Sequence, residues 1–403
     1  MLKARQPGMV FIFITILIDV IGLGIIIPVL PDLIASLTHS TITEAATWGG
    51  WLIGVYAFMQ FFFSPMMGAL SDSYGRRPII LISLLGLGLD YLLMALAPNI
   101  TLLFIGRILS GIMGASFTVA TAYIADVSTP EKRAQNFGML GAAFGLGFIL
   151  GPVIGGLLGN MGERFPFYAA AILSLLNFAY GVFILPESHP VENRRSFDWK
   201  RVNPFTSIKR LGQYKGMMGL IVAFFFLYLG SFAIQSTWSF FGKAQFHWDN
   251  ADVGYSLGAV GVLISLVQGG LIRYTSRVWG PTKSIVIGMA FAAIGLILFS
   301  FANAGWMMYA ILVPYCVGGI STPSLQGYMS NKVPLNEQGE MQGSLSSMVS
   351  ITAFVGPLIM TQTYSYFADS NAIVHFPGAA FMLGALFTIL ALVLTLRTLK
   401  KLV

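Results

Sequence analysis

The chain has 403 residues, of which 56% are hydrophobic and only 10% are charged, whereas a soluble domain carries about 25% charged residues. A soluble globular protein is therefore excluded. The formal net charge is +7, but the basic residues gather in short connections between apolar segments, where they indicate membrane topology rather than a nucleic-acid partner.

Apolar segments of about twenty residues follow one another along the chain, and each is long enough for an α-helix to cross a lipid bilayer. They predict an all-α integral membrane protein with twelve transmembrane helices. In the first half these cover residues 9–35, 48–70, 78–97, 101–124, 137–159 and 165–185. In the second half they cover residues 216–241, 252–273, 283–303, 305–329, 340–367 and 375–396.

The distribution of Lys and Arg predicts the orientation in the membrane. The outer connections carry only Arg164 and Lys243, whereas the connections on the other side carry nearly all the remaining positive charge. The positive-inside rule places that basic side in the cytoplasm. We therefore expect a multi-pass protein of the inner (plasma) membrane with both termini cytoplasmic.

The longest connection, residues 186–215, separates two predicted bundles of six helices, residues 1–185 and 216–403. Traces of a repeat support this division. Gly151-Pro152 recurs as Gly356-Pro357, and Gly68-x-Leu70 recurs as Gly269-x-Leu271, both at offsets close to half the chain length. Two parallel, pseudo-symmetric six-helix halves are typical of major facilitator transporters.

Three charged residues lie inside predicted helices. Asp19 and Asp90 fall near the bilayer midplane, and Arg107 lies about 9 Å from the outer end of its helix at the helical rise per residue. A lone charge at the midplane costs about 2.5–3.5 kcal/mol, so such groups need a partner or a cavity. We expect Asp19 to pair with Arg107, with Asp90 as the competing acceptor.

These intramembrane carboxylates predict proton coupling. A carboxyl group is protonated when desolvated and ionised when it pairs with arginine or faces water. A conformational change that alters these surroundings therefore moves a proton. The alternative is a static ion pair that only fixes the first helix against the fourth.

Residues 68–78, between the second and third helices, predict a cytoplasmic gate. The expected members of this gate are two glycines, two arginines and two carboxylates: Gly68, Gly75, Arg76, Arg77, Asp72 and Asp126. The glycines permit close helix approach and a tight turn, and the arginines can pair with the carboxylates to hold this face closed. The alternative is that the arginines only set topology.

The fifth helix carries a run of small residues with a proline, namely Gly147, Gly151, Pro152, Gly155 and Gly156. Small residues let helices pack closely and slide, and the proline frees a backbone carbonyl and kinks the helix. We interpret this run as a face on which the fifth helix packs closely against its neighbours and slides. Tight packing without any role in the direction of exchange is the alternative.

Polar or amphipathic side chains inside the helices are candidate substrate contacts, because an apolar cavity with a few hydrogen-bonding groups suits an amphipathic organic ligand. The candidates are Gln60, Tyr123, Asn177, Gln235, Trp238, Gln268 and Gln326. Hydrogen bonding between helices is an alternative role for each of them.

Several functional classes lack support in the sequence. There is no phosphate-binding G-x-x-x-x-G-K-[S/T] run, and the four histidines lack metal-ligand spacing. The single cysteine, Cys316, excludes an internal disulfide and cannot by itself form a thiolate metal site. We therefore expect no enzyme activity, no cofactor and no metal site.

Three motifs together resemble the signatures of major facilitator drug:proton antiporters: residues 68–78, residues 107–111 and the glycine-proline run of the fifth helix. Four further segments are similar to the tetracycline efflux pumps: residues 17–31, 56–60, 89–93 and 324–330. The resemblance covers nearly the whole chain and is densest in its first half.

This resemblance implies roles for single residues. It implies proton coupling and antibiotic export for Asp19, Asp90 and Arg107, a cytoplasmic gate for Asp72 and Arg76, and a place in the substrate path for Gln60. The chain departs from the best-known tetracycline pumps at two positions. Those pumps have a histidine in the eighth helix and an aspartate in the ninth, whereas the matching residues of this chain are Ile264 and Ala292.

The sequence therefore predicts a proton-coupled exporter of an amphipathic small molecule that works by alternating access, as a monomer. The candidate substrates are a tetracycline-like drug, another drug or a metal-chelating metabolite. Two alternatives remain open at this point: a proton-coupled uptake symporter and a membrane receptor that binds a ligand without transporting it.

Overall fold

The computed structural model describes residues 6–114, 116–197, 211–334 and 337–402, and this described part contains helices and connections but no strand. Twelve helical segments in it are long and apolar enough to cross a membrane, which confirms the predicted all-α class and the number of helices. Residues 198–210 of the predicted linker lie outside the described residues.

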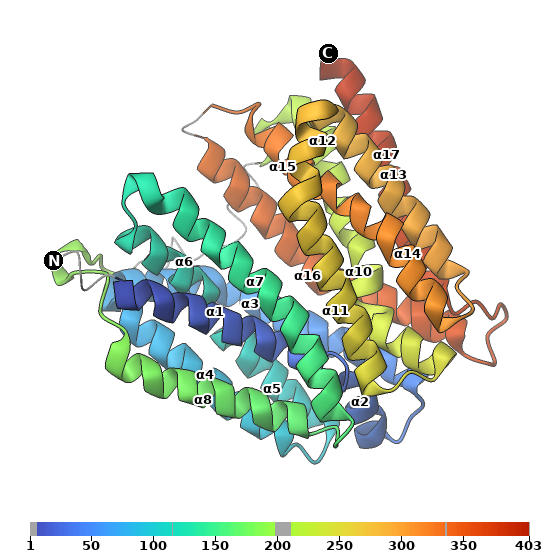
Figure 1. The fold of residues 1–403 in the computed structure, drawn as a ribbon, viewed down its shortest axis with the longest axis horizontal. Helices are drawn as coiled ribbons and strands as arrows, with labels where there is room; N and C mark the ends of the chain where they lie inside the picture. Colours follow the sequence, from blue (N-terminus) through green and yellow to red (C-terminus); the bar gives the residue numbers. More distant parts are fainter. Residues whose placement is uncertain (1–5, 115, 198–210, 335–336, 403) are drawn as a thin grey trace. The chain divides into compact units, whose positions relative to one another are not determined.

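The helices of the first half alternate with short connections (Figure 1). In chain order they are α1 (Gln6–Ile26), α2 (Leu30–Thr38), α3 (Ile42–Tyr74), α4 (Arg76–Ala95), α5 (Ile100–Met113), α6 (Ser116–Val127), α7 (Pro130–Gly159) and α8 (Phe165–Ile184). Three short 3-10 turns follow: η2 (Val191–Asn193), η4 (Leu211–Gln213) and η5 (Lys215–Met217).

The second half repeats this arrangement. Its elements are α10 (Met218–Phe246), α11 (Asn250–Leu266), the π-helical turn η6 (Val267–Leu271), α12 (Ile272–Val278), α13 (Gly280–Ser300), α14 (Gly305–Val317), the 3-10 turn η7 (Gly318–Ile320), α15 (Ser321–Ser330), α16 (Gln338–Ala368) and α17 (Ala379–Leu402).

The prediction of one helix over residues 9–35 is wrong at its end. Helix α1 ends at Ile26, and α2 begins at Leu30 after a short turn. Pro28 in this turn has no N–H to donate to the carbonyl of Gly24, which instead accepts from Ile27 at 3.2 Å. Hydropathy alone does not register this break, because the residues on both sides of it are equally apolar.

By internal contacts the chain forms two compact units. Unit 1 contains Met1–Thr38, Val55–Asn203 and Asp249–Gly258, and unit 2 contains His39–Gly54, Pro204–Trp248 and Ala259–Val403. Most of each predicted six-helix bundle falls in one unit, while residues 42–54 of α3 and residues 250–258 of α11 are grouped with the other unit.

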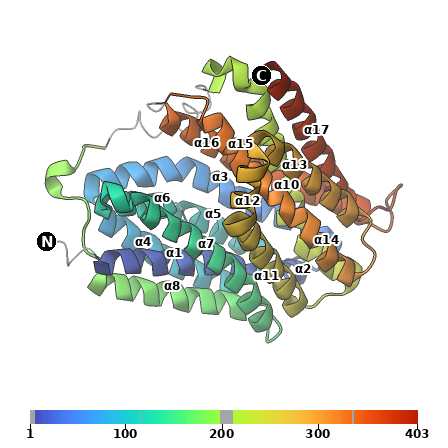
Figure 2. The ribbon, with the colours of Figure 1, turned by 45° about the horizontal axis from the view of Figure 1, so that its top comes forward.

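The pattern of neighbouring helices in unit 1 recurs in unit 2. Helix α1 packs against α7 and α8, and α4 packs against α5 and α8 (Figures 1 and 2). Correspondingly, α10 packs against α16 and α17, and α13 packs against α14 and α17. Helices that pack together in unit 1 thus have counterparts that pack together in unit 2. The same repeat is predicted by the two Gly-Pro pairs of the sequence.

The Gly-Pro pairs lie at equivalent contacts in the two units. A Cβ atom added at Gly151 in α7 would lie 2.9 Å from the carbonyl oxygen of Ile21 in α1. One added at Gly356 in α16 would lie 2.6 Å from the ring of Phe232 in α10. Glycine therefore permits the close helix approach at both places.

Candidate functional site

Five side chains from α1, α3, α4 and α5 form a charge cluster inside unit 1, in the middle of membrane-crossing helices: Asp19, Tyr56, Asp90, Tyr91 and Arg107. The charge of Arg107 acts on Asp90 and on both tyrosines, and the charge of Asp19 acts on both tyrosines. The structure thus brings together the three charged residues that the sequence singled out.

Glycines bring the helices of this cluster close to one another. A Cβ atom at Gly22 in α1 would lie 2.7 Å from the hydroxyl of Tyr91. One at Gly106 in α5 would lie 3.1 Å from Oδ1 of Asp90. The side chains of α4 can therefore reach α1 and α5 only because these positions carry no side chain.

Asp90 is buried, with 2% of its surface exposed, and neither carboxylate oxygen has a hydrogen-bond partner among the described residues. The nearby hydroxyl of Ser110 donates instead to the carbonyl of Gly106 at 2.9 Å. An ionised carboxylate is costly to bury without hydrogen bonds. The geometry around Asp90 therefore suits the protonated form.

Arg107 is only half-buried, and its hydrogen bonds go to a soft acceptor. Its Nη2 and Nε atoms donate to the sulfur of Met94 at 3.0 and 3.3 Å, and its guanidinium carbon lies 5.8 Å from the ring centre of Tyr56, within range of a cation–π interaction. A thioether is a weak acceptor, so a carboxylate can replace it at little cost. The pairing of Asp19 with Arg107 stays a prediction.

Gln60 lies beside the charge cluster, one turn after Tyr56 on α3. Its amide donates to the hydroxyl of Tyr56 and to the carbonyl of Gly114, both at 3.3 Å. Gly114 is the residue at which α5 ends. Gln60 therefore provides a partner for a backbone carbonyl at an interruption of the fourth transmembrane helix.

Tyr56, Tyr91 and Met94 belong to this site, but sequence reasoning did not single them out for a role. The available signal is their spacing, since Met94 follows Asp90 by four residues and Gln60 follows Tyr56 by four, which places each pair on one helix face. Aromatic and Met residues are so frequent in apolar helices that this spacing alone does not identify them.

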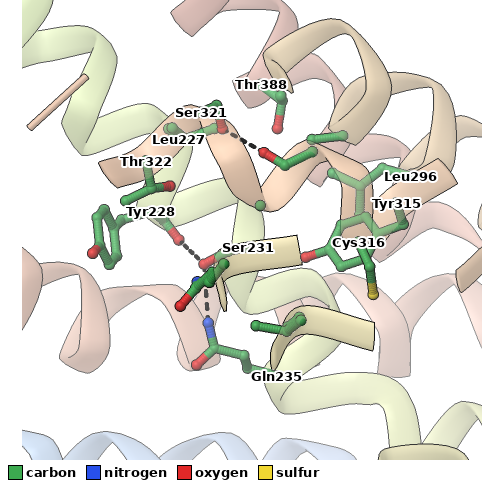
Figure 3. Close-up of a pocket in the computed structure, with 15 residues that line it drawn as sticks. Leu227, Tyr228, Ser231, Gln235, Leu296, Tyr315, Cys316, Ser321, Thr322 and Thr388 are labelled. Atoms are coloured by element: carbon green, nitrogen blue, oxygen red, sulfur yellow. Dashed lines mark hydrogen bonds between the residues drawn. The ribbon is translucent and has the colours of Figure 1, made fainter. Parts of the chain in front are cut away.

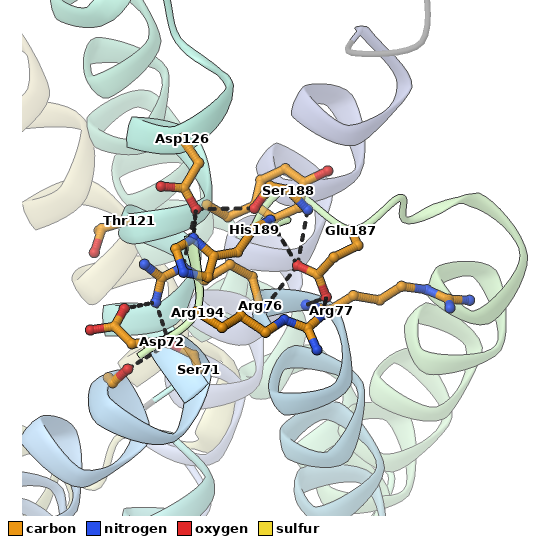
Figure 4. Close-up of polar contacts among 12 residues, drawn as sticks. Ser71, Asp72, Arg76, Arg77, Thr121, Asp126, Glu187, Ser188, His189 and Arg194 are labelled. Carbon is orange, nitrogen blue, oxygen red and sulfur yellow. Dashed lines mark hydrogen bonds and ion pairs between the residues drawn. The ribbon is translucent and has the colours of Figure 1, made fainter. Parts of the chain in front are cut away.

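A second polar cluster surrounds Arg76 at the start of α4 (Figure 4). Nη1 of Arg76 lies 2.5 Å from Oδ1 of Asp72, and its Nε lies 3.1 Å from Oδ2 of Asp126. The same Nη1 also donates to the hydroxyl of Ser71 at 2.5 Å. Arg76 is buried. Through these contacts it connects the ends of α3, α4 and α6.

The connection after α8 closes over this cluster, which sequence reasoning did not foresee. The carboxylate of Glu187 accepts the backbone N–H groups of Arg76 at 2.9 Å and Arg77 at 3.3 Å, and so serves the first turn of α4. Ser188 donates to Asp126 at 3.2 Å, and His189 lies 3.9 Å from Asp126. These contacts join residues more than sixty positions apart, and no local pattern signals them.

Gly75 and Arg77 have distinct roles at this turn. Gly75 has φ 105°, a conformation that favours glycine, and an added Cβ would meet the carboxylate of Glu187. The side chain of Arg77 points away from Asp72 and Asp126, the two carboxylates that pair with the side chain of Arg76. It donates to the carbonyl of Val182 at 2.7 Å, because adjacent residues on a helix point about 100° apart.

The other glycines of the two motifs differ in how closely they are packed. A Cβ at Gly68 would make only an ordinary contact of 3.7 Å with Thr118. Cβ atoms at Gly147, Gly151 and Gly155 would instead overlap residues 17–25 of α1. Pro152 and Gly156 belong to the same packed surface of α7, where Pro152 contacts Gly24 and Gly156 faces the first turn of α11.

The six candidate substrate contacts other than Gln60 divide into two groups. Four are engaged in packing or hydrogen bonds. Tyr123 donates to the carbonyl of Pro186 at 3.1 Å, Asn177 donates to Thr15 at 3.2 Å, the ring centroid of Trp238 lies 5.2 Å from that of Phe299, and Gln326 is hydrogen-bonded to Gln342. The other group, Gln235 and Gln268, lines a pocket.

This pocket lies inside unit 2 and has a volume of about 250 Å³ (Figure 3). It is formed by α10, α11, η6, α13, α14, η7, α15 and α17. Gln235 and Ser231 lie on its α10 side, and Tyr315 and Cys316 lie on its α14 side. Ile264 and Ala292 also line it.

Comparisons with known proteins agree with this architecture. Residues 12–357 and 271–401 match the Major Facilitator Superfamily. The class C tetracycline resistance protein of Escherichia coli is 40% identical over 380 residues, which cover 94% of this chain and 95% of that protein. The class G protein of Vibrio anguillarum is 38% identical, over 90% of this chain and 92% of its own.

Two solved structures show the same fold at low sequence identity. A bacterial homolog of the human lysosomal transporter Spinster, in an inward-facing and occupied conformation, superposes with a TM-score of 0.79 at 14% identity and covers 97% of this chain and 96% of its own. The human organic anion transporter MFSD10 (TETRAN) has a TM-score of 0.69 at 21% identity and covers 97% and 99%. The chain therefore belongs to the Major Facilitator Superfamily, in the group of the tetracycline resistance proteins.

Proposed function

We propose that this protein exports an amphipathic small molecule in exchange for protons, with a tetracycline-like drug as the first candidate. The observation that carries the proposal is the charge cluster of unit 1, in which the buried carboxylate of Asp90, without a hydrogen-bond partner among the described residues, lies near the half-buried Arg107. The tetracycline resistance proteins that resemble the chain over nearly its full length support the choice of substrate.

Asp90 and Arg107 have complementary parts in the proposed exchange. While Asp90 is protonated it is neutral, and Arg107 rests on the sulfur of Met94. When Asp90 loses its proton, its carboxylate is a stronger acceptor than the thioether, and Arg107 moves to it. This exchange of partners links a proton to the packing of α4 and α5 and, through Asp19, of α1.

Two further surfaces of unit 1 are proposed to convert this local change into alternating access. The cluster around Arg76 holds the ends of α3, α4 and α6 together with the connection after α8. The glycine face of α7 lets this helix pack on α1 without intervening side chains. In this proposal the first surface is the cytoplasmic gate and the second is the sliding contact.

The proposed substrate path includes Gln60 beside the charge cluster and the pocket residues Gln235 and Gln268. We further propose that both termini lie in the cytoplasm and that residues 186–215 link two six-helix bundles. The twelve apolar helices and the relatives together make this a multi-pass membrane transporter.

The test is tetracycline accumulation in inside-out membrane vesicles whose interior is acidic. Proton exit from the vesicles then drives drug entry if the protein is an exporter. We expect the wild-type protein to accumulate the drug and Asp19→Asn to lose the proton-driven part. Glu192→Gln changes an exposed carboxylate in the connection after α8 and serves as the control.

The outcomes separate the alternatives. Undiminished accumulation by Asp19→Asn removes Asp19 from proton coupling. Accumulation only in right-side-out vesicles with an acidic exterior identifies an uptake symporter. Binding of tetracycline to the purified protein without flux in either vesicle orientation identifies a receptor.

A further inference from the structure

The pocket of unit 2 is built without charge. Fifteen described residues line it, and none of them is Asp, Glu, Lys, Arg or His. Among all described residues, no group of three or more His, Cys, Asp or Glu side chains could hold a metal ion. The pocket therefore offers no partner for a charged group or for a bound cation.

Hydrogen-bonding groups are nevertheless present in the pocket. The hydroxyls of Ser231, Ser321 and Thr388 each donate to a carbonyl three or four residues earlier, at 2.7–2.9 Å. Because each proton is used in such a bond, these oxygens can serve a ligand only as acceptors. Gln235 donates to Ser231 at 3.0 Å, and an amide has a second N–H and a carbonyl oxygen for a ligand.

Apolar side chains form part of the wall beside these polar groups and Gln268. Leu227, Ile264, Ala292 and Leu296 line it together with the ring of Tyr315. Ile264 and Ala292 are the two positions at which the chain lacks the histidine and the aspartate of the best-known tetracycline pumps. Because both face the same pocket here, this departure removes two ionisable groups from a single site.

We infer that the part of the exported compound that enters this pocket is uncharged and arrives without a metal ion. A charge placed there would lose its hydration and gain no counter-charge. Because pockets for drug-sized ligands have volumes of about 300–1,000 Å³, a pocket of about 250 Å³ holds one end of such a compound. The matching chemistry is an apolar ring with hydroxyl, amide or carbonyl groups at its edge. This inference rests on the proposed function, because it describes the substrate of that export.

Equilibrium binding of labelled tetracycline to the purified full-length protein in detergent tests this inference, measured with EDTA and again with Mg²⁺. We expect the wild-type protein to bind the drug in EDTA with an affinity that Mg²⁺ does not change. Gln235→Glu replaces one amide by a carboxylate of the same size. We expect it to bind about tenfold more weakly in EDTA, because the carboxylate must be desolvated beside an uncharged ligand. Mg²⁺ should recover part of that loss.

Ala292→Asp and Ala292→Asn form a second, matched pair on α13, another helix that lines the pocket. The two side chains have the same shape and differ in charge, so any packing cost is common to both. We expect the Asp variant to bind metal-free drug about tenfold more weakly than the Asn variant.

Two outcomes would overturn the inference. One is wild-type binding that requires Mg²⁺. The other is equal binding by the charged and uncharged member of each pair, which would show that the drug does not enter the pocket. Absence of binding in both media, together with absence of accumulation in vesicles, would instead contradict the proposed function on which the inference rests.

Discussion

At the scale of single residues, the buried carboxyl group of Asp90 is the clearest feature that does not favour the stability of a membrane protein. It is 2% exposed, and both of its carboxylate oxygens lack hydrogen-bond partners among the described residues. A side chain kept only for structure would satisfy these atoms or be apolar. The arrangement is explained if Asp90 must accept and release a proton.

Asp90→Asn should therefore separate stability from function. The amide is always neutral, so it avoids the cost of burying an ionised carboxylate, and we expect a thermal unfolding midpoint in detergent equal to or above the wild-type value. The rate of proton-driven tetracycline accumulation should fall by at least about tenfold, which corresponds to an increase of about 1.4 kcal/mol in the activation free energy of transport. A variant with normal accumulation would show that Asp90 does not carry a coupled proton.

Residue identity alone predicted part of this site. Charged residues inside apolar segments are costly, so Asp19, Asp90 and Arg107 are conspicuous in the sequence. The soft acceptor of Arg107 is not conspicuous, because Met94 is one of 19 methionines. Its role follows from the packing of α4 against α5.

At the scale of elements, α7 shows how one helix can have two kinds of glycine. A Cβ at Gly155 would collide with the backbone of Ile25 in α1. At Gly138, nearer the start of the same helix, an added Cβ would meet nothing within 4 Å. The sequence shows both as glycine, and only the contact with α1 distinguishes them.

Gly155→Ala should destabilise the protein by about 1–3 kcal/mol through overpacking. Gly138→Ala should be neutral or stabilise it by up to about 1 kcal/mol, because alanine favours the helix. Unfolding midpoints of the two variants in detergent, with the wild type alongside, provide the measurement. Equal midpoints for the two variants would mean that α7 does not pack on α1 in solution as described.

Helix boundaries likewise could be predicted only in part from the sequence. Hydropathy placed all twelve helices, but it missed the turn around Pro28 and the interruption after α5 at Gly114. It also gave no sign that Glu187 accepts hydrogen bonds from the first turn of α4, 111 residues earlier in the chain. Such endings depend on partners that are distant in sequence.

At the scale of the whole molecule, each unit contains the same set of neighbouring helices, yet their polar groups differ. Unit 1 contains the charge cluster, whereas unit 2 contains a pocket whose described lining is uncharged. The two units therefore share a helix arrangement but differ in the charge of the side chains inside them. In the proposed function, the charge cluster of unit 1 binds and releases protons, and the pocket of unit 2 binds part of the substrate.

The predicted orientation can be checked with two introduced cysteines. Met161 is 69% exposed in the connection between α7 and α8, and Asn193 is exposed in the connection after α8. We expect a membrane-impermeant thiol reagent to label Met161→Cys in cells with an intact inner membrane and Asn193→Cys only in inside-out vesicles. The native Cys316 is buried and provides the unlabelled background. The reverse labelling pattern would invert the topology.

The sequence by itself determined the all-α class, the twelve helices and the three charged residues inside apolar helices, and it predicted the orientation in the membrane. These depend on the transfer of contiguous segments of about twenty residues into lipid, and hydropathy and charge describe that transfer well. Only the tertiary structure decided which groups come together: Arg107 meets Met94, Glu187 meets the start of α4, and Ile264 and Ala292 line one uncharged pocket. Contacts between helices depend on the packing of complementary surfaces from distant parts of the chain, and no local pattern records that packing.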